Sequence, residues 1–307
     1  ATNATPQQVK RSVRRSFIIG RRFRIVVAKR DWLQAAADLT KNELFPVLLE
    51  RPIEKEFQIT TFRRKPEMDD EGVVNENVYG SLEQDAERRD FTIDAFYLDP
   101  FRGEVLDPVG GMKDLRSGTL RVIGNPRARF EEDPIRIFRA LRFCNKLGLK
   151  LAKEDADALR ESLVTLKTAK RERIREELLK IMREGCAHSL TIDFQERGLW
   201  NVAFPILGEI YHRHKKTYEA TLDVARALDE IPWCHIQAPQ VLYYLWMAPL
   251  MFLHADKDVL NKVFEELKIF KNEAEQMMRI HTGVQKMLKD PTASQAQKLF
   301  LRNPKFS

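Results

Sequence analysis

The hydrophobic pattern of this 307-residue chain changes from short strand-like runs to repeated helix-like runs beyond Gly124. The strand-like runs, which are β-branched or alternating, cover Ser16 to Gly20, Arg22 to Arg30 and Phe57 to Arg64. The helix-like runs, in which apolar residues recur every three or four positions, cover Arg171 to Gly185, Tyr218 to Ile231 and Lys257 to Phe270. Side chains return to the same face every two residues in a strand and about every 3.6 residues in a helix. The sequence therefore predicts an α+β fold: a small mixed-sheet head followed by an all-α remainder.

Charge and cysteine usage narrow the class of protein. Lys and Arg number 52 against 45 Asp and Glu, giving a net charge of +7 and a pI near 9.2, which favours a polyanionic partner. The three scattered cysteines, Cys144, Cys186 and Cys234, form no disulfide framework, so we expect a reducing, cytoplasmic compartment. The longest apolar run, Val241 to Leu253, is too short to span a bilayer and contains Pro249. We therefore expect a buried helix there and no membrane partner.

One charged stretch opens an alternating run. The residues from Glu87 to Pro100 read ERRDFTIDAFYLDP, and the alternation from Phe91 onward predicts a β-strand. Arg88 or Arg89 can grip a phosphate, and Asp90 can hold a ribose hydroxyl or a metal-bound group. A charged turn before a strand remains the alternative for each of these residues taken alone.

A second candidate lies where the helical pattern begins. Asp133 and Arg136 are three positions apart, Pro134 suits a first helical turn, and Asp133 can cap that turn. A carboxylate accepts from the exocyclic amine of adenine or cytosine, and a guanidinium donates to the neighbouring ring nitrogen. Guanine and uracil place a carbonyl at the same position, so this pair can select A or C without a template. The alternative is an ordinary intrahelical salt bridge.

Further basic residues extend these candidates. Arg139 and Arg142 continue the spacing of Arg136, and Arg21 and Arg22 follow Gly20 at a strand start; all four can contact a triphosphate or simply face solvent. The basic stretches Lys167 to Arg175 and His212 to Lys216 predict RNA contacts, with solvated helix faces as the alternative. The candidate RNA-binding residues in them are Lys170, Arg171, Arg173, Lys215 and Lys216.

Three segments in order carry a family resemblance. RRDFTIDAFYLDP, VLDPVGGMKDLRSGTLRVIG and EEDPIRIFRALRF closely resemble the class II nucleotidyltransferases of the polymerase β superfamily, which comprise tRNA CCA-adding enzymes and bacterial poly(A) polymerases. GRRFRI at Gly20 to Ile25, PQVLYYLWMAPLM and KLFLRNPKF resemble the poly(A) polymerase branch more. The resemblance implies a nucleotidyltransferase head over residues 1–108, a helical neck for base recognition over 109–165 and an RNA-binding body over 166–307.

The resemblance also implies a reaction and its participants. The 3′-hydroxyl of an RNA attacks the α-phosphate of a nucleoside triphosphate, here ATP, and pyrophosphate leaves; two Mg²⁺ ions assist. By resemblance Asp90 belongs to the active site and Arg89 contacts the incoming nucleotide. Asp133 and Arg136 recognise its base.

Three departures from the family pattern qualify this expectation. The Asp-x-Asp pair that supplies the main metal ligands in the family precedes the position of Ala1, so we expect the chain to be incomplete at its N-terminus and inactive as given. Gln58 stands where relatives carry an acidic residue, and it cannot balance a divalent charge. Asp94 replaces the asparagine of RRDFTIN, which should weaken nucleotide binding unless its carboxylate is protonated, paired or metal-bound.

The sequence therefore predicts a template-independent polymerase that adds AMP from ATP to RNA 3′ ends. A CCA-adding enzyme acting on tRNA is the alternative of the same class. A non-catalytic RNA-binding relative without the metal site is the alternative of another class, and a helical scaffold with incidental charge is the plainest one.

Overall fold

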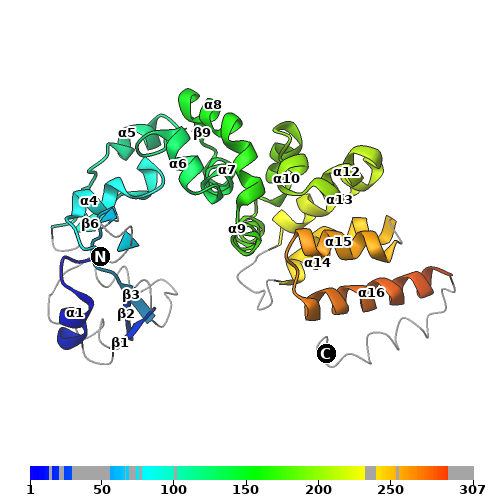
Figure 1. The fold of residues 1–307 in the computed structure, drawn as a ribbon, viewed down its shortest axis with the longest axis horizontal. Helices are drawn as coiled ribbons and strands as arrows, with labels where there is room; N and C mark the ends of the chain where they lie inside the picture. Colours follow the sequence, from blue (N-terminus) through cyan, green and yellow to red (C-terminus); the bar gives the residue numbers. More distant parts are fainter. Residues whose placement is uncertain are drawn as a thin grey trace. The chain divides into compact units, whose positions relative to one another are not determined.

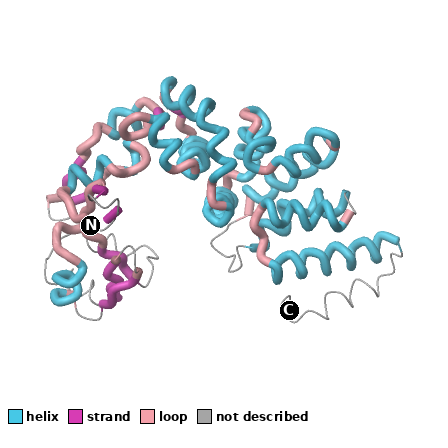
Figure 2. The backbone as a smooth tube through the Cα atoms, in the orientation of Figure 1, coloured by secondary structure: helices cyan, strands magenta, loops and turns pink. Residues whose placement is uncertain are grey.

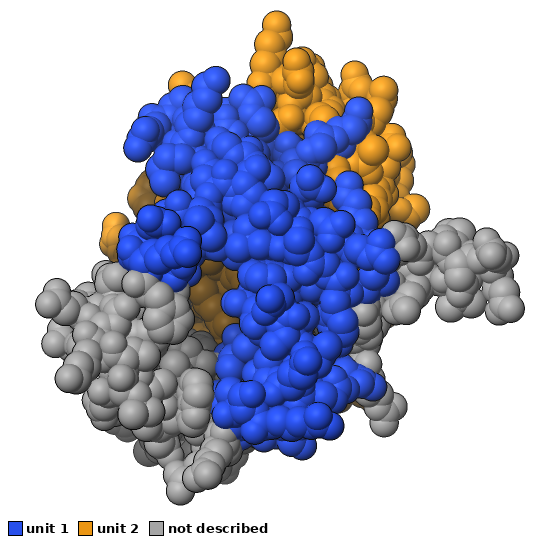
Figure 3. Space-filling model, turned by 90° about the vertical axis from the view of Figure 1, so that its left-hand side faces the viewer, with its two compact units in different colours: residues 1–125 blue, residues 126–307 orange. Residues whose placement is uncertain are grey.

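The chain forms two compact units, residues 1–125 and residues 126–307 (Figures 1 and 3). The computed structural model describes residues 1–13, 16–20, 24–29, 56–65, 67–68, 74–75, 78–99, 102–231, 240–253 and 256–289. The predicted division into a head, a neck and a body, with boundaries at residues 108 and 165, is not tested by these two units and stays a prediction.

Unit 1 begins with a helix packed on a three-stranded antiparallel sheet. Helix α1 (Pro6–Ser12) is capped by Thr5, and strands β1 (Ser16–Ile19), β2 (Ile25–Lys29) and β3 (Glu56–Ile59) pair in the order β1-β2-β3. Val9, Val13, Val26 and Ala28 form the buried core between helix and sheet. The three predicted strands are confirmed, because their β-branched residues provide the side chains that this core buries.

The rest of unit 1 is built from short elements. They are β4 (Glu67–Met68), β5 (Val74–Asn75), α4 (Leu82–Glu87), the 3₁₀ turn η1 (Thr92–Asp94), β6 (Tyr97–Asp99), β7 (Glu104–Leu106), α5 (Gly111–Arg116) and β8 (Thr119–Leu120). The strand predicted from Phe91 is therefore wrong for its first half. Phe91 and Thr92 are both buried although they are neighbours, so the segment does not alternate in space. The Asp94 carboxylate accepts the Phe91 backbone N–H at 3.3 Å, which favours a turn over a strand.

Unit 2 is almost entirely helical, as predicted (Figure 2). Its elements are α6 (Pro126–Glu132), α7 (Ile135–Leu147), β9 (Lys150–Leu151), α8 (Lys153–Ser162), η2 (Leu163–Thr168), α9 (Arg171–Arg183), α10 (Ala187–Glu196), α11 (Leu199–Ala203), α12 (Pro205–Arg213), α13 (Lys215–Asp229), α14 (Gln240–Leu253), α15 (Lys257–Glu266) and α16 (Lys271–Lys289). Helix α7 packs against α9, and α13 packs against α10 and α14.

An aromatic cluster fills the core of unit 2. Phe138 of α7 meets Phe194 of α10 edge to face at 5.4 Å between ring centroids, and the ring centroid of Trp200 lies 4.9 Å from that of Phe194. Helix α14, predicted as a buried helix despite Pro249, places Trp246 5.9 Å from Trp200. Within the described residues no helix combines the length and apolar character that crossing a membrane needs.

Two helices of unit 2 are capped by carboxylates from other helices. The residues before α10 and α12, Cys186 and Phe204, provide no side-chain cap. Instead Asp229, the last residue of α13, accepts the first two N–H groups of α10 at 2.7 and 2.9 Å. Glu266 of α15 accepts N–H groups near the start of α12 at 3.0 and 3.1 Å. These bonds tie distant helices together and satisfy helix-terminal donors.

Candidate nucleotide-binding site

The segment with Arg88, Arg89 and Asp90 lies at the end of a well-capped helix. Ser81 and Gln84 form a reciprocal capping box at the start of α4, which then ends at Glu87. Directly after the segment, Phe91 is fully buried and bridges Val122. The capped helix on one side and the buried ring on the other fix the three charged residues in a short turn.

Both arginines of this turn bind one carboxylate. Nε of Arg88 donates to Oδ1 of Asp85 at 3.0 Å, and Nη2 of Arg89 donates to Oδ2 at 3.1 Å. The Asp85 side chain is only 3% exposed, whereas Arg88 and Arg89 keep 33% and 39% of theirs exposed. The structure thus buries the acid and leaves each arginine side chain partly exposed. Sequence reasoning missed Asp85, although its spacing of three and four residues from the two arginines is a signal that could have found it.

Backbone hydrogen bonds hold the neighbouring Asp90 segment in place. The N–H of Ile123 donates to the carbonyl of Asp90 at 3.1 Å, and the N–H of Thr92 donates to the carbonyl of Arg121 at 2.9 Å. The Thr92 hydroxyl donates to buried Asp114 at 2.8 Å. Asp90 is therefore carried on a braced turn, as a residue with an active-site role requires.

The structure gives Asp94 a local partner. Its carboxylate oxygen accepts the Phe91 N–H, a contact that the oxygen of an asparagine amide makes equally well. The expected effect of Asp94 on nucleotide binding stays a prediction. Gln58, the second departure, lies on β3 with an exposed side chain.

Magnesium requires several oxygen ligands that converge on one point. Among the described residues no three His, Cys, Asp or Glu side chains come together in a way that holds a metal ion. The residues described therefore do not by themselves fit the two-ion site that the family resemblance implies.

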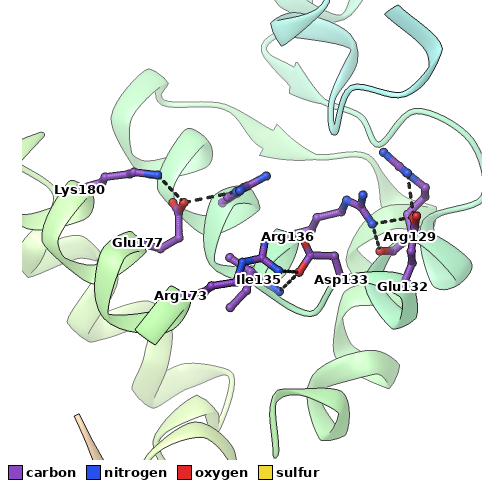
Figure 4. A network of polar contacts seen from close by, with 9 residues as sticks. Arg129, Glu132, Asp133, Ile135, Arg136, Arg173, Glu177 and Lys180 are labelled. Atoms are coloured by element: carbon purple, nitrogen blue, oxygen red, sulfur yellow. Dashed lines mark hydrogen bonds and ion pairs between the residues drawn. The ribbon is translucent and has the colours of Figure 1, made fainter. Parts of the chain in front are cut away.

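In unit 2 the Asp133 carboxylate is fixed at the junction of α6 and α7 (Figure 4). Arg173 of α9 binds it in a bidentate manner, with N–O distances of 2.8 and 2.7 Å. Oδ1 also accepts the Ile135 N–H at 3.2 Å, which confirms the predicted capping of this turn. A carboxylate has about four acceptor positions, so one remains for a ligand donor after these three bonds.

Arg136 turns back towards the end of α6 rather than along the α7 ladder (Figure 4). Its Nη1 donates to the Arg129 carbonyl at 2.7 Å and to Glu132 at 2.8 Å. Glu132 also accepts from Arg129 at 2.8 Å. Since Arg136 is 9% exposed, these contacts brace the chain where Pro134 separates the two helices.

Arg139 and Arg142 meet a buried acid that sequence reasoning missed. Glu177 of α9, 2% exposed, lies 3.3 Å from Nε of both arginines, and Lys180 donates to it at 2.8 Å. Arg142 also binds Glu184 at 3.0 Å. The predicted ladder therefore ties α7 to α9, and these ion pairs join residues too far apart in sequence to produce a periodic signal.

The remaining sequence candidates are spread over unit 2 or lie elsewhere. Arg171 donates to the carbonyl of Ala203, and Arg173 holds Asp133. Lys170 before α9 and Lys215 and Lys216 at the start of α13 are exposed. Arg21 and Arg22 lie outside the described residues.

Two family descriptions match this chain. Residues 1–121 match the poly A polymerase head domain, and residues 148–210 match the probable RNA and SrmB-binding site of polymerase A. The chain belongs to the nucleotidyltransferase family of bacterial poly(A) polymerases and CCA-adding enzymes. This confirms the resemblance seen in the sequence.

Individual relatives come from both branches of the family. Poly(A) polymerase I of Escherichia coli O157:H7 is 34% identical over 206 residues, which are 67% of this chain and 42% of that protein. A CCA-adding enzyme of Bacillus pumilus is 30% identical over 184 residues, 60% of this chain and 40% of that protein. The chain thus spans less than half the length of these relatives.

Solved structures confirm the α+β fold. The CCA-adding enzyme of Bacillus stearothermophilus in complex with CTP matches with a TM-score of 0.58 at 21% identity, over 94% of this chain and 60% of that one. A tRNA nucleotidyltransferase complexed with a primer tRNA and an incoming ATP analogue matches with a TM-score of 0.56 at 20% identity, over 97% of this chain and 75% of that one.

Proposed function

We propose that the protein adds AMP from ATP to the 3′ ends of RNA without a template. The observation that carries this proposal is the Asp133 carboxylate, which Arg173 and the Ile135 N–H fix at the start of α7 with one acceptor position to spare. A fixed carboxylate accepts from the amine of adenine or cytosine and repels the carbonyl of guanine or uracil. The 34% identity to a poly(A) polymerase I supports adenine as the preferred base.

The other charged residues take complementary roles in this proposal. Arg88 and Arg89, whose side chains are partly exposed, bind the triphosphate beside Asp90. Asp133 recognises the base, Arg136 braces the turn that carries it through the Arg129 carbonyl and Glu132, and Arg139 and Arg142 support α7 through Glu177. In the reaction the RNA 3′-oxygen forms a bond to the α-phosphorus, the bond to the β-phosphate oxygen breaks, and pyrophosphate leaves. The binding residues named here orient the triphosphate for that attack.

RNA is the proposed partner, and the helical unit is its proposed binding surface. The match over residues 148–210 to a probable RNA-binding site supports this assignment, as does the net charge of +7. The exposed lysines Lys170, Lys215 and Lys216 are the candidates for phosphate contacts. Mg²⁺ as the cofactor and a cytoplasmic location stay predictions from the sequence.

A CCA-adding activity on tRNA is the second candidate. Cytosine offers Asp133 the same amine as adenine does, and CCA-adding enzymes are among the relatives at 30% identity or more. Both candidates use the same charged residues, so they differ in the order and number of nucleotides added.

The test offers the full-length protein each nucleoside triphosphate together with an unstructured RNA or a tRNA that ends before CCA. Long adenylate tails on the unstructured RNA are expected. Addition of CCA to the tRNA alone would reject poly(A) synthesis in favour of the second candidate. RNA binding without any nucleotide transfer would identify a non-catalytic relative instead.

A further inference from the structure

The chain segment with α5 and β8 contacts the turn that carries Asp90 at several points. The N–H of Thr92 donates to the Arg121 carbonyl at 2.9 Å, and the N–H of Ile123 donates to the Asp90 carbonyl at 3.1 Å. Phe91, between the two bonded residues of the turn, is fully buried. The backbone from which the Asp90 side chain extends is therefore fixed by residues that follow it by some thirty positions.

Gly111, at the start of α5, lies very close to the Thr92 backbone. A Cβ atom at Gly111 would lie 2.1 Å from the Thr92 carbonyl oxygen and 2.7 Å from the carbonyl carbon, whereas ordinary van der Waals contact begins at 3.4 Å. The neighbouring Gly110 has a left-handed φ of 76°, but Gly111 does not. Gly111 is thus required by its close approach to Thr92 and not by its own backbone conformation.

Asp107 holds Gly111 in this position. Its carboxylate oxygens accept the N–H groups of Gly111 at 2.8 Å and of Met112 at 2.9 Å, which satisfies two donors at the start of α5. Movement of the start of α5 away from Thr92 would break these bonds. A side chain at position 111 therefore has to displace the Thr92 backbone rather than the helix.

Asp114 of α5 holds Thr92 by its side chain. One oxygen of this buried carboxylate accepts the Thr92 hydroxyl at 2.8 Å, and the other accepts Nε of Arg121 at 3.1 Å. Because the Arg121 carbonyl accepts the Thr92 N–H, one carboxylate orders both partners of that backbone bond. Thr92 is only 4% exposed, so its hydroxyl serves this contact and not a ligand.

We infer that Gly111 and Asp114 are positioning residues, which set the place of Asp90 in the active site through their contacts with Thr92. The inference rests on the proposed function, because the active-site role of Asp90 belongs to that proposal. It adds two residues that act through Thr92 rather than on the substrate.

The arginines proposed to bind the triphosphate are held by a different element. Arg88 and Arg89 both donate to Asp85 of α4. A change at α5 that moves Asp90 should therefore lower kcat for adenylation more than it raises the KM for ATP.

Gly111→Ala tests this inference in steady-state adenylation by the full-length protein, with ATP varied at saturating RNA. Urea unfolding gives the folded fraction of each variant, and rates are expressed per folded molecule. A misplacement of about 1 Å in an active site can cost about a hundredfold in rate, so we expect kcat to fall at least about tenfold and KM to change less than about threefold.

The control variant is Gly118→Ala, at the other end of α5. Gly118 has a φ of 66°, and a Cβ atom there would meet no atom within 4 Å. The added methyl group strains the backbone without touching Thr92, so kcat per folded molecule should equal that of the wild type. A kcat for folded Gly111→Ala equal to that of the control would overturn the inference.

Thr92→Val and Thr92→Ser test the contact with Asp114 and decide the question if Gly111→Ala does not fold. Valine keeps the shape of threonine but removes the hydroxyl, so kcat should fall about threefold to tenfold. Serine keeps the hydroxyl and should remain within about twofold of the wild type. Equal kcat values for the folded valine and serine variants would contradict the positioning role of Asp114.

Amide hydrogen exchange separates this inference from the proposed function. The Thr92 and Ile123 amides should exchange about tenfold or more faster in Gly111→Ala than in the wild type or in Gly118→Ala. If the wild type transfers no nucleotide but exchange differs in this way, the proposed function fails and the positioning of the Asp90 turn stands. If the wild type transfers AMP while exchange is equal in all three proteins, the positioning role fails alone.

Discussion

Single carboxylates decide what the arginines of this protein do. Asp85 is buried but leaves its two arginines accessible, whereas Glu177 lies beneath Arg139 and Arg142 and ties α7 to α9. From the sequence alone these arginines cannot be told apart, because it shows that they are basic but not which carboxylates they contact. In both places a buried carboxylate fixes the position of two arginine side chains.

Glu177→Gln should destabilise unit 2. The amide keeps the size of the side chain but removes the buried charge that faces Arg139 and Arg142, and loss of one member of a buried pair costs about 3–5 kcal/mol. Because Arg139 and Lys180 are partly exposed, with 30% and 48% of their side chains accessible, we expect a smaller cost of about 2 kcal/mol from urea unfolding. A cost below about 0.5 kcal/mol would contradict a supporting role.

The matched control for this substitution is Glu131→Gln. Glu131 is 57% exposed and faces Arg127 at 3.7 Å on the same helix, so its ion pair is solvated. We expect a change within about 0.5 kcal/mol, as for most surface substitutions.

Asp133→Asn should relax the choice of base. An amide both accepts and donates, so the carbonyl of guanine or uracil is no longer repelled. We expect the preference for ATP over GTP, measured as the ratio of kcat/KM values, to fall about tenfold or more, in line with roughly 1–3 kcal/mol for a base contact. An equal loss for all four nucleotides would show that Asp133 supports the fold or the triphosphate instead.

At the scale of elements, two helices that have no capping side chain of their own are capped by a carboxylate from another helix. Asp229 joins the end of α13 to the start of α10, and Glu266 joins α15 to α12. Burial raises the pKa of both carboxyl groups, although the N–H donors oppose this effect. The caps therefore bring charge into half-buried positions while satisfying helix ends.

These raised pKa values predict a pH dependence of stability. A carboxyl whose pKa is higher in the folded state than in the unfolded state binds more protons when folded, so its contribution to stability grows as pH falls through the window between the two values. For Asp229 this window extends upward from the ordinary Asp value of about 3.9. The free energy of unfolding of the wild type should therefore rise relative to Asp229→Asn as pH is lowered from neutrality towards that value.

Asp223→Asn provides the control for this measurement. Asp223 lies on the same helix with 74% of its side chain exposed, so its removal changes the helix charge without touching the cap of α10. Its stability difference from the wild type should change less over the same pH range. The opposite order for the two variants would refute the raised pKa of Asp229.

Elements with a strong period were predictable, and contacts between them were not. The β-branched runs of β1 to β3 and the three-and-four spacing of α9, α13 and α15 gave correct secondary structure. The turn at Thr92 was mistaken for a strand because its shape depends on the hydrogen bond from Phe91 to Asp94 rather than on alternation. The caps that Asp229 and Glu266 provide join residues tens of positions apart in the sequence, and no local pattern predicts them.

For the whole molecule, motif order was more informative than composition. The candidate residues Asp90 and Asp133 followed from charged segments beside predicted elements, and the resemblance placed them in one family, which the comparisons confirmed. Glu177 and the Arg173 contact to Asp133 could not be predicted, since each depends on how separate elements pack within a unit. A net charge of +7 indicated only that a polyanion is a favoured partner.

The salt dependence of RNA binding tests which of the protein's positive residues contact RNA phosphates. Each phosphate contact with single-stranded RNA contributes about 0.7 to the slope of log affinity against log salt concentration. If exposed Lys215 and Lys216 both contact phosphates, their joint replacement by alanine should make that slope shallower by about 1.4 and weaken binding alike for every RNA sequence. The control variant replaces Lys257 and Lys262, exposed residues of α15, and removes the same charge. A smaller change of slope is expected for the control, and equal changes in the two variants would show that the protein's overall charge, rather than contacts at the start of α13, attracts the RNA.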